Sequence, residues 1–183
     1  MVGANSRPGC TRPKGGRSVN DTLELTNPGV LIPLLQRHGF YTRKALGQHF
    51  LLSRAALDAI IDACALDEGL PVLEIGPGIG TVTRALAERG AEVTAVELDP
   101  RAIAVLHETV GDFTDVTIAQ GDILKLDLAA LLDERMWTIV GNLPYYITTP
   151  VIARVLEQAA RIRRAVFMVQ REVADRMAAP PRR

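Results

Sequence analysis

Residues 71–80 decide the fold of this chain, and they read Pro71-Val72-Leu73-Glu74-Ile75-Gly76-Pro77-Gly78-Ile79-Gly80. The apolar run has the length of a buried strand. Three glycines then follow at alternate positions, where they let the backbone turn sharply and approach a ligand closely. The dinucleotide-binding fingerprint would place a further glycine at position 81, but Thr81 stands there. The turn is therefore either part of a nucleoside-binding site or a purely structural turn. In the first case Thr81 argues against a nicotinamide dinucleotide as the ligand.

Outward from this turn, strand-like and helix-like segments alternate along the chain. Short apolar runs predict strands at Pro71–Ile75, Glu92–Glu97, Val116–Ala119, Trp137–Gly141 and Ala165–Val169. Capping residues and helical spacing predict helices from Pro28, from Ser53, at Thr81–Arg89, from Pro100, near Asp127–Leu132, from Pro150 and at Arg171–Ala178. Strands that alternate with helices over short connections predict an α/β fold with a doubly wound parallel sheet.

The composition is that of one ordinary globular domain. The chain has 183 residues, of which 48% are hydrophobic and 23% charged. Its two cysteines, Cys10 and Cys64, exclude a disulfide framework and a cysteine-built zinc site, and they suit a reducing cytosol. The sequence has no secretory signal and no apolar run of the ~20 residues that a membrane helix needs, so we expect a cytoplasmic protein without membrane contact. We assign residues 1–26 to a disordered basic arm and residues 27–183 to the folded domain.

The net charge of zero conceals an uneven distribution of charges. Residues 1–49 carry seven Lys or Arg against two acids, and residues 161–183 carry seven Arg against two acids. Residues 50–160 carry seven basic and seventeen acidic side chains. Basic ends around an acidic middle favour binding of an anionic polymer at the ends, with solvated surface charge as the alternative.

Polar or glycine-rich residues follow each predicted strand, at the end where α/β sheets bind ligands. Glu97 ends the second strand and could accept hydrogen bonds from both hydroxyls of a ribose. Asp122 follows the third strand and could accept one from an adenine amino group. The alternatives are a solvated acid at position 97 and a helix cap at position 122.

The tetrapeptide Asn142-Leu143-Pro144-Tyr145 follows the fourth strand. An adenine N6 amino group is a poor nucleophile because its lone pair is delocalised into the ring. The side-chain oxygen of Asn142 and a backbone carbonyl held by Pro144 could accept its two N–H bonds and direct the lone pair at an electrophile. Tyr145 could stack on a base taken out of its helix. The alternative is a turn with a buried tyrosine.

Six ordered motifs give the chain a resemblance to the bacterial adenine N6-dimethyltransferases of small-subunit ribosomal RNA. They span about residues 28–180 and are Lys44-Ala45-Leu46-Gly47-Gln48-His49-Phe50-Leu51, the glycine turn with its strand, Val96-Glu97-Leu98-Asp99, Gly121-Asp122-Ile123-Leu124, Gly141-Asn142-Leu143-Pro144-Tyr145-Tyr146-Ile147-Thr148-Thr149-Pro150, and Met168-Val169-Gln170-Arg171-Glu172-Val173-Ala174-Asp175-Arg176-Met177. The resemblance implies a Rossmann-like S-adenosylmethionine-dependent methyltransferase fold. It also implies transfer of methyl groups to N6 of two adjacent adenines in the 3'-terminal hairpin of that RNA, as a step of ribosome biogenesis.

The resemblance also assigns site residues. Those that bind the methyl donor would be His49, Leu51, Gly76, Glu97, Asp122 and Asn142. Those that act on the adenine would be Asn142, Leu143, Pro144 and Tyr145, with Phe167 either closing the pocket or packing in the core. No metal is expected, because the sulfonium methyl group is already activated. The implied partner is small-subunit RNA within the pre-30S particle, and the family is expected to be monomeric.

Two features depart from the family pattern. Position 49, usually Asn, is His here, and an imidazole can still make one hydrogen bond while adding a dependence on pH. The family continues beyond residue 180 with further strands and a helical RNA-binding domain, whereas this sequence stops at Arg183. We therefore expect a sheet of five strands whose last strand is an edge, measurable donor binding, self-association, and weak or absent methylation by this chain alone.

Three other functions compete with this one. The first is the related large-subunit adenine methyltransferase that confers antibiotic resistance, which the segment Tyr146–Pro150 disfavours. The second is a non-catalytic RNA-binding or assembly factor, which intact Glu97 and Asn142 disfavour. The third is a nicotinamide-dependent oxidoreductase, which Thr81 disfavours.

Overall fold

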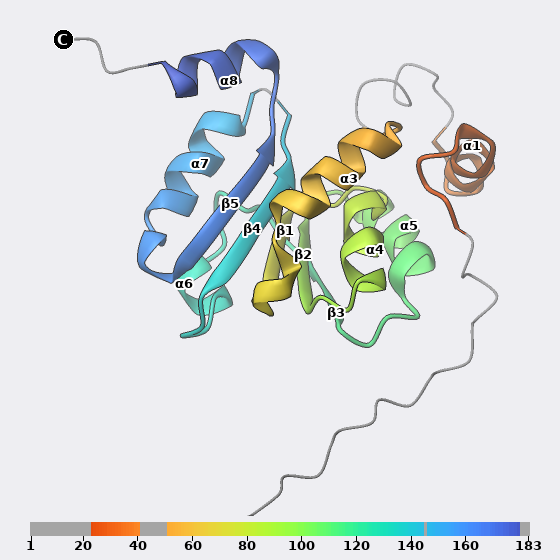
Figure 1. The fold of residues 1–183 in the computed structure, drawn as a ribbon. Helices are drawn as coiled ribbons and strands as arrows, with labels where there is room; N and C mark the ends of the chain where they lie inside the picture. Colours follow the sequence, from red (N-terminus) through yellow and green to blue (C-terminus); the bar gives the residue numbers. More distant parts are fainter. Residues whose placement is uncertain (1–22, 41–50, 145, 180–183) are drawn as a thin grey trace, which may run out of the picture.

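A computed structural model of the chain describes residues 23–40, 51–144 and 146–179 (Figure 1). Most of the predicted basic arm, and the two predicted site residues His49 and Tyr145, lie outside the described residues.

Within the described residues, five parallel strands form one sheet in the order β3-β2-β1-β4-β5. The strands are β1 Val72–Ile75, β2 Val93–Glu97, β3 Val116–Gln120, β4 Trp137–Asn142 and β5 Ile162–Met168. The first strand lies in the centre and the order reverses beside it, which places a topological switch point between β1 and β4. The predicted doubly wound α/β fold is confirmed.

Helices cover both faces of the sheet (Figure 1). One face carries α3 Arg54–Ala63, α4 Thr81–Glu88 and α5 Pro100–Val110, and the other carries α6 Leu128–Leu131 and α7 Thr148–Leu156. Neighbouring residues of β1 show the division, because Val72 packs among residues of α3 and α4 while Leu73 packs among residues of α6 and α7. Both faces of β1 are thus buried, as its continuous apolar run predicts.

Two predicted boundaries differ from the structure by more than one residue. Helix α7 begins at Thr148 rather than Pro150, so the proline stands in the first turn, where its missing N–H costs nothing. Strand β5 begins at Ile162 rather than Ala165, because Arg163 and Arg164 hide its start in the sequence. Both arginines are paired with Glu68, at 3.3 and 2.9 Å. Helix α8, Arg171–Ala178, follows β5 as predicted and has no buried residue.

Helix α1, Pro28–Arg37, packs against the edge of the domain formed by α5. Asn27 caps it by accepting the N–H of Gly29 at 2.8 Å. Its buried leucines join Ile79 of the glycine turn and Val105 of α5 in one cluster; they are Leu31, Leu34 and Leu35. Leu25, which precedes this helix, joins the same cluster at 4% exposure. No helix in the described part of the chain is long and apolar enough to cross a membrane.

Candidate functional site

The glycine turn after β1 adopts backbone angles that other residues rarely reach. Gly76, Gly78 and Gly80 have φ of 68°, 58° and 89°. At Gly80 a side chain is also excluded by space, since a Cβ there would stand 2.7 Å from Leu106 Cδ1 of α5. At Gly76 no atom lies within 4 Å of the corresponding point. The turn is therefore packed tightly on its α5 side and open along its first residues.

Glu97, at the end of β2, holds the turn in place. Its Oε2 accepts the backbone N–H of Gly78 at 2.9 Å, while its Oε1 accepts those of Leu98 and Asp99 at 2.8 and 2.9 Å. These bonds fix the carboxylate beside the turn, at the position predicted for a ribose ligand. Leu98, which the sequence analysis did not single out, is 62% exposed next to it and is a further candidate as an apolar surface for a flat base.

A small pocket of about 40 Å³ joins three of the predicted residues. Leu51, Gly76 and Asn142 all line it, together with Glu74, Pro77, Gly78, Ile79, Thr81 and Val82. Residues from before α3, from the end of β1 and from the end of β4 therefore meet at the switch point, as the strand-end rule predicts.

Glu74 is a site residue that the sequence analysis missed. The side chain is 3% exposed and lines the small pocket, and its Oε2 has no hydrogen-bond partner among the described residues. Burial raises the pKa of Glu74 to about 7, with a further rise from the charge of Glu97 and an opposing effect of the Thr83 hydroxyl. An acid inside an otherwise apolar strand was the signal that could have found it.

Asp122 follows β3 and makes local interactions. Its Oδ1 accepts the N–H of Leu124 at 3.0 Å, and its Oδ2 lies 3.5 Å from Lys125 Nζ. The backbone N–H of Gly121 donates to the carbonyl of Glu97 at 2.9 Å, so the ends of β2 and β3 are adjacent. Asp122 is not among the residues that line the small pocket. The bonds of Asp122 close a turn at residues 122–126 and do not cap a helix, because the next helix, α6, is capped by Asp127; a role of Asp122 in donor binding stays a prediction.

The last residue of β4, Asn142, lines the pocket, and the next residue, Leu143, is buried at 6% exposure. The carbonyl of Pro144 accepts the Thr148 hydroxyl at 3.0 Å and the Ile147 N–H at 3.2 Å, which ties the turn to the start of α7. Phe167 packs against the core cluster that includes α7 residues, in agreement with the core alternative of the two that we considered.

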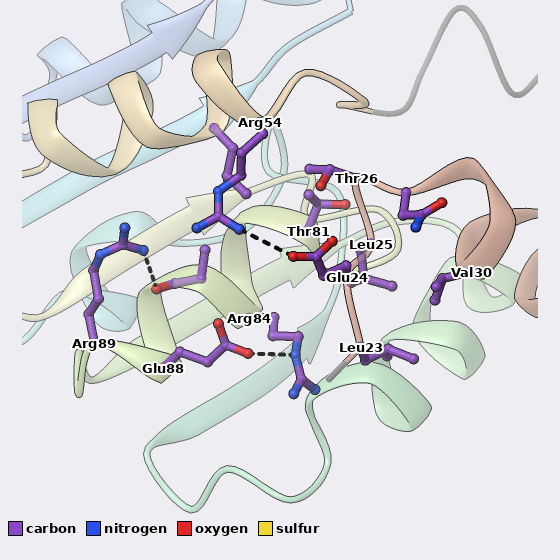
Figure 2. Close-up of a pocket in the computed structure, with 13 residues that line it drawn as sticks. Leu23, Glu24, Leu25, Thr26, Val30, Arg54, Thr81, Arg84, Glu88 and Arg89 are labelled. Carbon is purple, nitrogen blue, oxygen red and sulfur yellow. Dashed lines mark hydrogen bonds and ion pairs between the residues drawn. The ribbon is translucent and has the colours of Figure 1, made fainter. Parts of the chain in front are cut away.

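A larger cavity of about 410 Å³ lies elsewhere, between residues 23–27, α3 and α4 (Figure 2). Arg54 Nη1 lies 3.9 Å from Glu24 Oε1, and Arg84 Nε lies 2.8 Å from Glu88 Oε1. Arg89 donates to the Ala85 carbonyl at 3.1 Å. Arg54 and Arg84 are thus paired with acids of the cavity wall, and none of the predicted site residues lines the cavity, so we centre the functional site on the strand ends.

Comparisons with known proteins identify the family of this chain. The family model described as "Ribosomal RNA adenine dimethylase" matches residues 39–183. Curated relatives named ribosomal RNA small subunit methyltransferase A are 44% identical over 153 residues in Bacillus licheniformis and 41% identical over 161 residues in Alkaliphilus oremlandii. These matches cover 81% and 86% of this chain but 52% and 56% of the relatives, so the chain spans about half the length of the curated relatives it matches.

Two solved structures share the fold and part of the sequence. The crystal structure of the 23S rRNA methyltransferase ErmE aligns with a TM-score of 0.62 at 34% identity, over 69% of this chain and 50% of that chain. A dimethyladenosine transferase from Plasmodium falciparum aligns with a TM-score of 0.59 at 27% identity, over 72% of this chain and 47% of that chain. The motif order, the strand-end site and these matches agree, and the chain belongs to the ribosomal RNA adenine dimethylase family.

Proposed function

We propose that the packed chain from Leu23 onward is the methyl-transferring domain of a small-subunit ribosomal RNA adenine dimethyltransferase. It transfers methyl groups from S-adenosylmethionine to N6 of two adjacent adenines in the 3'-terminal hairpin of that RNA. The observation that carries this proposal is the small pocket, because it brings Leu51, Gly76 and Asn142 together from three separate segments.

The residues around the pocket fit a cationic nucleoside donor. Glu74 offers a buried carboxyl group whose Oε2 has no partner among the described residues, as expected of a group that faces a positively charged ligand. The space beside Gly76 lets a ligand lie against the backbone, and Glu97 stands at the strand end for the ribose hydroxyls. A volume of about 40 Å³ encloses only part of such a donor, so the remainder lies along the strand ends beside Glu97 and Asp122.

Asn142 and the backbone after it act on the adenine. The side-chain oxygen of Asn142 accepts one N–H of the amino group. The second acceptor is the carbonyl of Leu143, since the carbonyl of Pro144 is already bonded to Thr148 and Ile147. Holding both N–H bonds directs the nitrogen lone pair toward the pocket, and Tyr145 stacks on the flipped base. The donor supplies an activated methyl group on a sulfonium, so the chain's task is to position the nucleophile.

The expected partner is the pre-30S particle in the cytoplasm. Small-subunit RNA is favoured over large-subunit RNA because the curated relatives named above carry small-subunit names and are 44% and 41% identical, against 34% for ErmE.

The proposal is tested with tritiated donor and purified ribosomal subunits that lack the modification. Protein is kept in excess over subunits, so that a slow single turnover suffices. We expect label in small subunits, recovered as N6,N6-dimethyladenine, and none in large subunits. Asn142→Ala should abolish the label, and Asn27→Ala, a change in the cap of α1, serves as a matched control. Label in large subunits but not in small subunits, or failure of the folded protein to bind the donor, would refute the proposal.

A further inference from the structure

Glu74 stands out because a carboxyl group occupies a position that the fold otherwise fills with apolar side chains. It is the third residue of β1 and faces the side of the sheet where Leu51 and Val82 line the same pocket. The side chain is 3% exposed, and its Oε2 has no hydrogen-bond partner in the described part of the chain. A buried carboxylate with an oxygen that lacks a partner is unfavourable, so such a group either keeps a proton or meets a cation.

The groups that face Glu74 from the packed elements supply no positive charge. Thr83 of α4 offers only a neutral hydroxyl, whose hydrogen bond lowers the pKa of Glu74 less than burial raises it, and Glu97 of β2 has the same sign. Cys64, at the end of α3, is a neutral thiol, because burial and the charge of Glu74 raise its pKa to about 11. The guanidinium of Arg164, which lies beside Cys64, donates to the Cys64 carbonyl at 3.2 Å and to Glu68 at 2.9 Å.

Asn142 lines the same small pocket as Glu74. If Asn142 holds the amino group that is methylated, then the sulfonium must reach this pocket for the methyl group to be transferred. A positive charge there lies close to Glu74 in surroundings of low polarity, where a Coulomb interaction is strong. The sulfonium of the methyl donor thus supplies the positive charge that the protein does not place beside Glu74.

Building on the proposed function, we propose that Glu74 is a proton-linked counter-charge for the sulfonium of the methyl donor. Before the donor binds, Glu74 holds a proton, and on binding it releases that proton to solvent and becomes a carboxylate. In the transfer the S–C bond breaks, its electron pair stays on sulfur, the N–C bond forms, and the amino group gives one proton to solvent. The ligand is then a neutral thioether, and Glu74 takes a proton back from solvent. The product is thereby held less tightly than the donor.

The test is calorimetric titration of the chain with S-adenosylmethionine and with S-adenosylhomocysteine, in buffers of different ionisation heat. Because burial raises the pKa of Glu74 to about 7, donor binding should release about half a proton at pH 7 and close to one at pH 6. Donor affinity should be about tenfold lower at pH 6 than at pH 8. The neutral thioether should release clearly fewer protons. Glu74→Gln should lose the release and the pH dependence, and protons from the ligand's own amino group cancel in the comparison.

Two control variants keep the result specific. Glu92→Gln makes the same change near the opposite end of β2, where Glu92 pairs with Arg135, and should behave as wild type. Glu108→Gln makes the same change on α5, where Glu108 pairs with Arg37 and His38, and should also keep the release. Donor binding without proton release, equal release with both ligands, or release that survives in Glu74→Gln would each overturn the inference. Failure of the folded wild-type protein to bind the donor would instead refute the proposed function, and the inference with it.

Discussion

The hydroxyl of Thr109 on α5 donates a hydrogen bond of 2.8 Å to the carbonyl of Ile79, in the middle of the glycine turn. Thr109 is buried, and its own carbonyl accepts the Arg84 guanidinium of α4 at 2.9 Å. One residue therefore joins the turn to two helices. The shape of the turn depends on these contacts as well as on its glycines.

Replacing Thr109 with valine tests this support. Thr109→Val keeps the shape of the side chain but leaves the Ile79 carbonyl buried without its donor, which costs about 1–3 kcal/mol of stability. We also expect weaker donor binding, because the turn loses its fixed position. Thr117→Val, on an exposed residue of β3, is the matched control and should change the free energy of unfolding little. Urea denaturation measures both variants, and equal stability of the two would contradict the supporting role.

Helix α1 should contribute to stability through its buried face alone. Leu34 is 1% exposed in the cluster that contains Ile79, whereas Ile32 on the same helix is 37% exposed. Leu34→Ala should therefore cost about 2–5 kcal/mol, and Ile32→Ala much less. Thermal and urea unfolding of the two variants provide the comparison. Similar losses in both would mean that α1 does not pack on the turn as described.

The free energy of unfolding should depend on pH because Glu74 gains and loses a proton. Its pKa is raised from 4.5 to about 7, so the folded state holds this proton more tightly than the unfolded state does. The resulting stabilisation is complete below the unfolded pKa and is lost as pH rises through about 7. Relative to Glu74→Gln, the wild type should lose about 3 kcal/mol of unfolding free energy between pH 4.5 and 8.

Urea denaturation across this pH range measures the difference between the two proteins. Other carboxyl groups, such as Glu92 and Glu108, have a lowered pKa because they bond to Arg135 and to His38 with Arg37. Their contributions run in the opposite direction at lower pH and cancel in the comparison. A constant difference between wild type and Glu74→Gln would mean that Glu74 titrates normally.

Asn142 should affect the methyl transfer more than the binding of the donor. In the proposed mechanism its side chain holds the acceptor amino group, so Asn142→Ala removes an interaction made with the reacting nucleophile. We expect single-turnover methylation of small subunits to fall by far more than donor affinity. Equal losses in both measurements would assign Asn142 mainly to donor binding.

The sequence was sufficient for the architecture because the signals are local. The strand β1 is a short apolar run closed by Gly76, and Asn27 and Ser53 cap helices as their residue types predict. The rule that parallel sheets bind ligands at the carboxyl ends of their strands then predicted that Glu97 and Asn142 lie near the glycine turn, and it needed no distances.

Features that depend on contacts between distant segments could not be predicted in the same way. Glu74 becomes a buried group only because elements far along the chain close over it. The start of β5 was missed because Arg163 and Arg164 are neutralised by Glu68 from another part of the chain. Similarly, nothing local to Pro144 indicates that the Thr148 hydroxyl occupies its carbonyl.

The most direct measurement of the central claim is calorimetric titration of wild type, Glu97→Ala and Glu92→Ala with S-adenosylmethionine. Glu97 lies at the site end of β2 and accepts the Gly78 N–H at 2.9 Å, whereas Glu92 precedes the opposite end of the same strand and pairs with Arg135. We predict saturable binding of one donor per wild-type chain and unchanged binding by Glu92→Ala. Glu97→Ala should lose about 2–4 kcal/mol of binding free energy, the scale of losing charge-assisted hydrogen bonds. Folded Glu97→Ala that binds as tightly as wild type, or folded wild type that does not bind, would contradict a methyl-donor site at these strand ends.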